Sequence, residues 1–330
     1  MRDADERTMT RMLPTAPMKR LSRPDNPQQP FSITERDVAM VRFVGRVGSA
    51  TSDQVARFVG GSVKNIGNRL KLCFFFGYLD RPLQQRTHLS AFFDRGNAPL
   101  IYSLGRAGAR LLASLGDPIN AHLSWSLKNA RATAPFLAHR IDTTAFVLQL
   151  ILACRAEGAP LLIDHHEQLP FFPQQTRESA DPYRLRVTIP SGAFNKPVSV
   201  SVVPDRLVSL AYADDTRHNF ACEIDRGSMP VKSKSIAGRS NYRRKLATYF
   251  HAHQQECHKT QWGFQGFRVL TIAPSEARIS HMIEAQREVT NDRLAGLFLY
   301  ATPRRLNERG AFAPIWMTSE CDGVSLLDRK

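Results

Sequence analysis

Apolar residues at helical spacing first appear just after residue 30. Three valines recur every third position, at Val38, Val41 and Val44, which is the spacing of one buried face of an α-helix. Thr34 precedes them and Asp37 follows it by three positions, which is typical of a capped helix start. The pattern predicts a first helix that ends near Val47, before Gly48.

Two more helices and a short ribbon are predicted after this helix. Ser52 and Ser62 each stand at a helix start, and the third helix has one apolar stripe, made of Val63, Ile66, Leu70 and Cys73. Two short strands follow, at 78–79 and 100–104, with a loop rich in arginine and glutamine between them. Three short helices followed by a two-stranded ribbon indicate a winged helix-turn-helix domain at 31–116.

Polar side chains on the third predicted helix are candidates for DNA contacts. In such a domain this helix enters the major groove, where amide and cationic side chains reach base edges. The candidates are Lys64, Asn65, Asn68 and Arg69. In the ribbon, Arg81, Arg86 and His88 are candidates for phosphate or minor-groove contacts. Two alternatives stay open: a solvated helix face, or a winged helix that binds a protein partner.

The rest of the chain predicts a second domain and flanking segments. Proline-rich residues 1–30 read as a disordered basic tail, and 117–134 as a linker. The second domain, 135–310, starts with a long helix to residue 157, continues with a run of strands, and then alternates helix and strand. This order predicts an α/β (α+β) domain with a mixed sheet flanked by helices. Residues 311–330 read as a C-terminal tail with one possible strand.

Three carboxylates lie in the strand-rich stretch 198–226, where the alternating valines of 198–202 predict the first strand of the sheet that holds them. Asp205 precedes one predicted strand, and Glu223 and Asp225 end the next. Glu223 and Asp225 are two positions apart, so their side chains point to the same face of a strand. If the two strands pair antiparallel, Asp205 approaches that face. Three neighbouring carboxylates repel unless a cation lies between them, and Mg²⁺ or Mn²⁺ prefers such oxygen ligands. The alternative is a solvated strand end.

The charge balance narrows the class of partner. The 330 residues include 45 Lys and Arg against 30 Asp and Glu, a net charge of +15. This excess favours a polyanion, with DNA ahead of an anionic membrane. No apolar run is long enough to predict membrane insertion, and no signal peptide is predicted. Five widely spaced cysteines without a C-x-x-C pair fit reduced thiols in a cytoplasmic protein.

A basic segment follows the carboxylates directly. Eight Lys and Arg residues lie between 226 and 259, against one acid. Within it, Arg239, Arg243 and Arg244 are candidates for contacts with the DNA backbone. A helix predicted at about 240–254 places Lys245 and Tyr249 on one face, four positions apart. His139, a single histidine early in the helix from 135, fits a structural role better than a catalytic one.

Pro204-Asp205, followed by Glu223-x-Asp225 and a basic helix, resembles the PD-(D/E)xK nuclease superfamily. With the N-terminal winged helix, the chain resembles the replication-relaxation family of plasmid and mobile-element proteins, which includes MobC-class relaxases. The resemblance implies a restriction-endonuclease-like sheet at 135–310 and nicking or relaxation of plasmid DNA. It also implies a plasmid origin and other mobilisation or replication proteins as partners, with Asp205, Glu223 and Asp225 holding the metal.

One departure from the superfamily pattern bears on activity. The pattern has lysine two positions after the glutamate, and this chain has Asp225 there. Lys245, ahead of Lys232 and Lys234, is the preferred substitute, as a cation beside the scissile phosphate. Alternatively, Asp225 is a third metal ligand, or the site is degenerate and the protein is a non-catalytic DNA-binding initiator or regulator. Covalent attack by Tyr242 or Tyr249 is a further, less favoured route.

Overall fold

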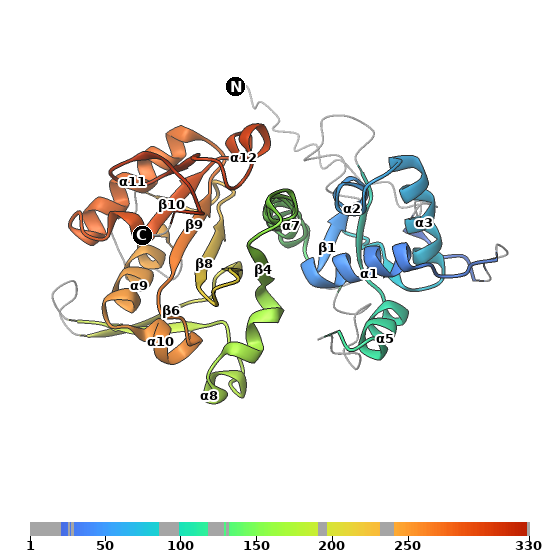
Figure 1. The fold of residues 1–330 in the computed structure, drawn as a ribbon, viewed down its shortest axis with the longest axis horizontal. Helices are drawn as coiled ribbons and strands as arrows, with labels where there is room; N and C mark the ends of the chain where they lie inside the picture. The colour runs from blue at the N-terminus through green and yellow to red at the C-terminus, as the bar shows by residue number, and fades with distance from the viewer. Residues whose placement is uncertain are drawn as a thin grey trace, which may run out of the picture.

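A computed structural model describes residues 21–25, 27, 30–85, 99–117, 129, 132–190, 197–231 and 241–328. Its elements form two groups with one long helix, α7 (Ala134–Glu157), between them. Figure 1 shows the N-terminal group in blue and teal on one side of α7, and the larger sheet domain in yellow to red on the other.

The N-terminal group contains the predicted helices and ribbon strands. Its elements are α1 (Glu35–Val47), β1 (Ser49–Thr51), α2 (Ser52–Val59), α3 (Val63–Phe75), β2 (Leu79–Asp80), β3 (Ile101–Leu104) and α5 (Arg106–Ser114). The strands form an antiparallel sheet of order β1-β3-β2. The capping box of Thr34 with Asp37 is confirmed, whereas α2 is capped by Thr51. Val63 is 56% exposed, so the buried stripe of α3 begins at Ile66.

A mixed seven-stranded sheet forms the centre of the second group, which confirms the predicted α/β class. The strands are β4 (Leu161–Asp164), β7 (Arg206–Ala211), β8 (Arg217–Ile224), β9 (Arg268–Ile272), β10 (Phe298–Ala301), β11 (Trp316–Met317) and β12 (Asp322–Val324). Their order is β12-β11-β10-β9-β8-β7-β4. β8, β9 and β10 are parallel, and the other pairs are antiparallel. The carboxyl ends of β8, β9 and β10 therefore lie at one edge.

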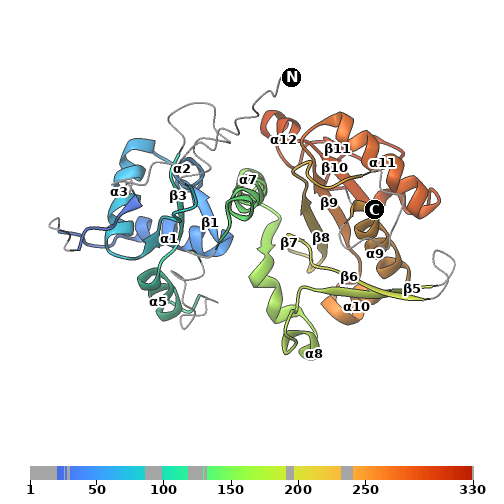
Figure 2. The same cartoon turned by 180° about the vertical axis from the view of Figure 1, so that it is seen from behind.

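Helices cover both faces of this sheet (Figures 1 and 2). Ala221 and Val269 pack with α9 (Tyr242–Gln254) and α11 (Glu276–Thr290). Cys222 and Leu270 belong to the core that α7 and α12 (Pro303–Arg309) share. Alternate residues of each strand thus face opposite helical layers.

One predicted strand belongs to a different sheet. β6 (Val198–Val202) pairs antiparallel with β5 (Leu185–Ile189) in a separate two-stranded sheet. This hairpin contacts α9 and α10 (Cys257–Trp262). The expectation that 198–202 is part of the sheet that holds the acids is therefore wrong. Two short helices, η2 (His165–Phe171) and α8 (Gln174–Arg177), precede β5 in the chain. A third, η3 (Ala295–Leu297), precedes β10.

The helix α7 joins the two groups. Thr144 Oγ1 donates to the Ser49 carbonyl at 2.7 Å, and Gln54 Nε2 donates to the Ile141 carbonyl at 3.0 Å. Among the described residues, α7 is the one helix that is long and apolar enough to cross a membrane, by length and composition alone. It contacts α1 and α2 on one side and β4 and β8 on the other, and these contacts within the chain account for its apolar composition.

The two predicted tails differ from the structure where it describes them. β11 and β12 extend the main sheet, and Trp316 is fully buried, so the C-terminal segment is part of the domain rather than a tail. In the N-terminal segment, Leu21 is buried and Arg23 donates to the Phe74 carbonyl at 2.7 Å. Most of the predicted linker 117–134 lies outside the described residues.

Candidate functional site

Asp205 and Glu223 lie opposite each other at the carboxyl edge of β8. Arg206 pairs with Cys222 in the antiparallel register of β7 and β8, so the next residues, Asp205 and Glu223, face each other one step further. The backbone N–H of Ile224 donates to Asp205 Oδ2 at 2.8 Å. The antiparallel pairing on which the prediction depended is therefore present.

The helix α9 supplies two partners to Glu223. Lys245 Nζ lies 2.5 Å from Glu223 Oε2, and the Tyr249 hydroxyl donates to Oε1 at 2.6 Å. Their spacing of four positions puts both side chains on the same side of α9. The Glu223 side chain is 7% exposed and that of Lys245 is 31% exposed. The structure thus places the predicted lysine against one of the predicted acids.

Burial and charge oppose each other in this pair. Burial raises the pKa of Glu223 above its usual range, although the Lys245 ammonium acts in the other direction. For Lys245, burial favours the neutral amine, but the charges of Glu223 and Asp205 outweigh it and raise the pKa. Lys245 is therefore a cation at neutral pH.

His139 is a member of the site that the sequence did not identify. From α7, its Nε2 lies 3.2 Å from Asp205 Oδ2. This hydrogen bond raises the pKa of His139 above its usual range. Burial disfavours ionised Asp205, yet the contacts with His139 and Lys245 lower its pKa. A single histidine on a helix gave no sequence signal that it would meet a carboxylate of another element.

Asp225 has a partner of its own. Arg278 on α11 donates to both of its oxygens, from Nε at 2.8 Å and Nη2 at 2.9 Å. The Gly227 N–H also donates to Oδ2, at 3.1 Å, and Arg278 reaches the Met229 carbonyl at 2.5 Å. This bidentate pair fixes the chain just after β8 and engages both carboxylate oxygens of Asp225.

A cavity of about 530 Å³ opens beside these residues. Its wall includes His139, Glu223, Asp225 and Lys245, with the exposed ring of Phe136 at its side. The volume is within the range of ligand pockets, and the carboxyl edge of strands is where open α/β sheets bind ligands. A second cavity, of about 310 Å³, shares Ile224, Asp225 and Arg226 and continues between α7 and α12.

A family model described as replication-relaxation matches residues 41–261. This chain belongs to the replication-relaxation family. The match includes His139, Asp205, Glu223 and Lys245 and stops short of Arg278. No curated protein and no solved structure matches the chain.

Neither tyrosine of α9 is placed as a nucleophile in this family member. The Tyr249 hydroxyl is buried against Glu223, and the Tyr242 hydroxyl donates to that of Tyr300 at 3.1 Å. Burial raises the pKa of both hydroxyls well above the usual range. A phenol that is buried, hydrogen-bonded and protonated is a poor nucleophile, so the geometry disfavours covalent attack by either one.

The three carboxylates predicted to hold a metal ion have different partners in the structure. In the described part of the chain, no group of three or more His, Cys, Asp or Glu side chains is arranged to hold a metal ion. Arg278 occupies both oxygens of Asp225. Asp205 and Glu223, whose oxygens contact His139, Lys245 and Tyr249, are the two neighbouring carboxylates that could hold a metal ion together. This donor set fits Mg²⁺, which commonly binds one or two carboxylates together with water and substrate phosphates.

The DNA-contact candidates on α3 divide into two groups. Lys64, Asn65 and Asn68 are exposed. Arg69 forms a salt bridge with fully buried Asp37, donates to the Ser32 carbonyl at 2.9 Å, and lies over the Phe31 ring. Arg69 therefore joins α3 to α1, and its guanidinium is not free for a base edge.

The structure describes three of the remaining basic candidates for DNA contacts, Arg81, Arg243 and Arg244. Arg81 is 8% exposed and donates to the Tyr102 hydroxyl at 2.8 Å, so it belongs to the core rather than to a phosphate-binding surface. Arg243 forms a salt bridge with Glu288, and Arg244 lies partly exposed at the start of α9. Arg86, His88 and Arg239 lie outside the described residues.

Proposed function

We propose that this replication-relaxation protein nicks or relaxes the DNA of a plasmid or other mobile element at the cavity beside Asp205, Glu223 and Lys245. The observation that carries the proposal is the 2.5 Å contact of Lys245 with Glu223, directly across from Asp205. In this proposal, Lys245 of α9 takes the role of the lysine that the PD-(D/E)xK pattern has on the strand.

Each residue has a role that its surroundings support. Lys245 is held as a cation and stabilises negative charge that develops on the scissile phosphate. Asp205 and Glu223 would hold Mg²⁺ or Mn²⁺, which when bound polarises the phosphate and lowers the pKa of a water ligand. His139 positions Asp205 through their 3.2 Å contact. Phe136 and Arg226 line the cavity where a DNA strand would enter.

The N-terminal group is proposed to bind duplex DNA as a winged helix. The exposed Lys64, Asn65 and Asn68 on α3 suit base edges and phosphates in the major groove. The excess of 15 positive charges supports a polyanionic partner. A plasmid origin is the proposed target, with other mobilisation or replication proteins as further partners.

A second candidate function is a non-catalytic initiator or regulator on a nuclease-like fold. One observation favours it: each of the three acids already contacts a cationic or protonatable side chain, namely His139, Lys245 and Arg278. A site in which the protein itself balances the carboxylates can be structural. Both functions need DNA binding, so binding alone does not separate them.

Plasmid cleavage with matched variants tests the enzyme proposal. Glu223→Gln keeps the shape and the hydrogen bond with Tyr249 but removes the charge. Wild type should convert supercoiled plasmid carrying its own origin to the nicked or relaxed form with Mg²⁺, and the variant should lose at least a hundredfold in rate. Glu256→Gln, which changes an exposed pair with Lys259, is the control and should match wild type. Equal rates for Glu223→Gln and wild type would refute the assignment, and tight DNA binding without conversion by any of them would support the regulator.

Duplex binding is tested separately on α3. Lys64→Ala combined with Asn68→Ala should weaken binding to origin DNA by roughly tenfold or more, because each good base contact contributes about 1–3 kcal/mol. Arg110→Ala, at an exposed position of α5, is the matched control. If both proteins bind with wild-type affinity at the same salt concentration, α3 is not the DNA-binding helix.

A further inference from the structure

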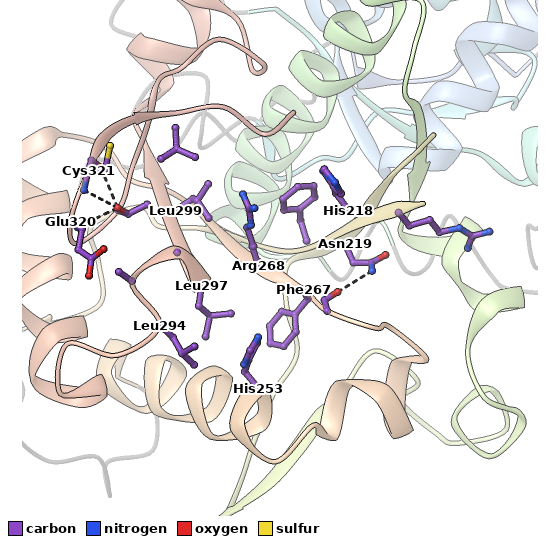
Figure 3. A pocket seen from close by; sticks show the side chains of 17 residues that line it. His218, Asn219, His253, Phe267, Arg268, Leu294, Leu297, Leu299, Glu320 and Cys321 are labelled. Carbon is purple, nitrogen blue, oxygen red and sulfur yellow. Dashed lines mark hydrogen bonds between the residues drawn. The ribbon is translucent and has the colours of Figure 1, made fainter. Parts of the chain in front are cut away.

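Another cavity lies at the opposite edge of the main sheet from the acids. Its volume is about 600 Å³, and it opens where β8 and β9 begin and where η3 leads into β10. Residues of the C-terminal segment, including Thr318, Glu320 and Cys321, complete its wall. Figure 3 shows this cavity with Arg268 near its centre.

Arg268 gives the cavity its positive charge. It is the first residue of β9, opposite Phe220 in the parallel register, and its side chain is partly buried. Among the described residues it has no hydrogen-bond acceptor, ion-pair partner or aromatic ring, whereas Arg206, Arg278 and Arg305 each contact a carboxylate. A guanidinium without a carboxylate partner in a concave site is suited to an anion, and its planar fork matches a phosphate.

A second arginine adds to this positive charge. Arg217 lies in the wall, with its guanidinium carbon 3.9 Å from the centre of the Phe171 ring and no carboxylate partner in the described part of the chain. His218 and His253 also line the cavity. Glu320 is the one acid of the lining, and it lies exposed at the rim. The lining therefore carries more positive than negative charge.

The rest of the lining is apolar. Leu294, Leu297 and Leu299 lie along one side in Figure 3, and Phe267 lies beside His253 with ring centres 5.7 Å apart. Leu294 is 39% exposed, whereas Leu297 and Leu299 are buried. A ligand for this cavity needs an apolar, preferably flat portion together with an anionic group, and Glu320 can accept a hydrogen bond from a hydroxyl or amino group on it.

We propose that this cavity binds a nucleoside phosphate, with the phosphate at Arg268 and the base against the exposed side chain of Leu294. The chemistry is shared by a free mononucleotide and by the end of a single DNA strand, and the test separates them. The proposal does not depend on plasmid nicking, because no residue of this cavity lies among the carboxylates or their partners.

Fluorescence anisotropy with an anthraniloyl-labelled AMP tests the site in the full-length protein. We expect saturable binding by wild type and at least tenfold weaker binding by Arg268→Gln. Arg309→Gln, at an exposed arginine of α12 outside the cavity lining, is the charge-matched control and should bind as wild type does. Equal affinity of Arg268→Gln and wild type, with both folded by thermal melting, would overturn the proposal, as would no saturable binding by wild type.

Competition assigns the source of the ligand and the role of the apolar wall. Unlabelled AMP and a ten-nucleotide oligothymidine are titrated against the label, and the stronger competitor identifies the form that the cavity takes. Leu294→Ser, a change at a half-exposed position that should not affect folding, should weaken AMP several-fold while inorganic phosphate competes as before. If Leu294→Ser binds AMP as tightly as wild type does, the apolar wall does not contact a base and the nucleoside assignment is wrong.

Discussion

Removal of Lys245 should lower the free energy of unfolding, because it leaves the charge of buried Glu223 without a partner. The substitution Lys245→Met keeps the length and the apolar stem and deletes the ammonium that lies 2.5 Å from Glu223 Oε2. Loss of one partner from a buried pair costs about 3–5 kcal/mol, because the other charge is left uncompensated. Lys245 is 31% exposed, so water replaces part of its contribution, and we expect a loss of about 2–3 kcal/mol in the free energy of unfolding.

The effect should depend on pH in one direction. Burial already raises the pKa of Glu223, and loss of the ammonium raises it further. A carboxyl whose pKa is higher in the folded than in the unfolded protein binds more protons when folded, so stability falls as pH rises through the folded-state pKa. The deficit of Lys245→Met should therefore be smaller at pH 5 than at pH 8.

Urea unfolding followed by circular dichroism, at pH 5 and pH 8, measures both quantities. Lys259→Met is the matched control, because Lys259 also contacts a glutamate, Glu256, but both side chains are exposed. Exposed pairs contribute about 0–1 kcal/mol. If Lys245→Met is no more destabilising than Lys259→Met, or if its deficit grows toward pH 5, the account of a buried, charge-compensated Glu223 is refuted.

Three further predictions concern other parts of the molecule. Arg69→Ala leaves a fully buried carboxylate on α1 without its partner, so urea unfolding should show a loss of about 2–3 kcal/mol, and a loss below 0.5 kcal/mol would contradict the packing role. Arg278→Gln breaks the bidentate pair with Asp225, at a cost of about 1.5–3 kcal/mol, so amide hydrogen exchange just after β8 should accelerate by roughly ten- to more than a hundredfold; unchanged exchange would show that the pair does not hold this segment. Cys321 is exposed and should react with a thiol reagent in the folded protein before Cys73, whose pKa burial raises to about 12, whereas equal rates would contradict that burial.

Capping residues and apolar spacing predicted individual helices and strands well, because both depend on residues that are close together in the sequence. Thr34 and Asp37 are a capping box in the structure as in the sequence, and the long helix near 135–157 is confirmed as α7. The same patterns did not predict contacts between elements that are far apart in the sequence. Alternation in 198–202 correctly indicated a strand, but a strand's alternation does not specify which strand it pairs with, and β6 pairs with β5. The short β11 and β12 carry too few residues to show a period.

The same distinction applies to the candidate site. Spacing along β8 and an antiparallel neighbour brought Asp205 to Glu223, and a four-residue spacing on α9 brought Lys245 and Tyr249 to the same carboxylate. His139 could not be predicted, since its contact with Asp205 depends on where α7 crosses the end of the sheet. Arg69 and Arg81 looked like DNA contacts in sequence because a guanidinium can equally hold a buried carboxylate or an aromatic ring.

Asp225 stands at the position where the PD-(D/E)xK pattern that the sequence resembles has lysine, and this difference affects the charge at the carboxyl edge of β8. A lysine two positions after Glu223 would share its face and neutralise it, but Asp225 adds a second negative charge to that face. The structure compensates each acid from a different helix: Lys245 of α9 contacts Glu223, and Arg278 of α11 contacts Asp225. The site therefore keeps a lysine beside its glutamate while an additional salt bridge fixes the segment that follows. Because Lys245 is attached to a helix and not to the strand, its position relative to the acids depends on how α9 packs on the sheet. Substitutions in that packing, as well as in the acids, should therefore affect the site.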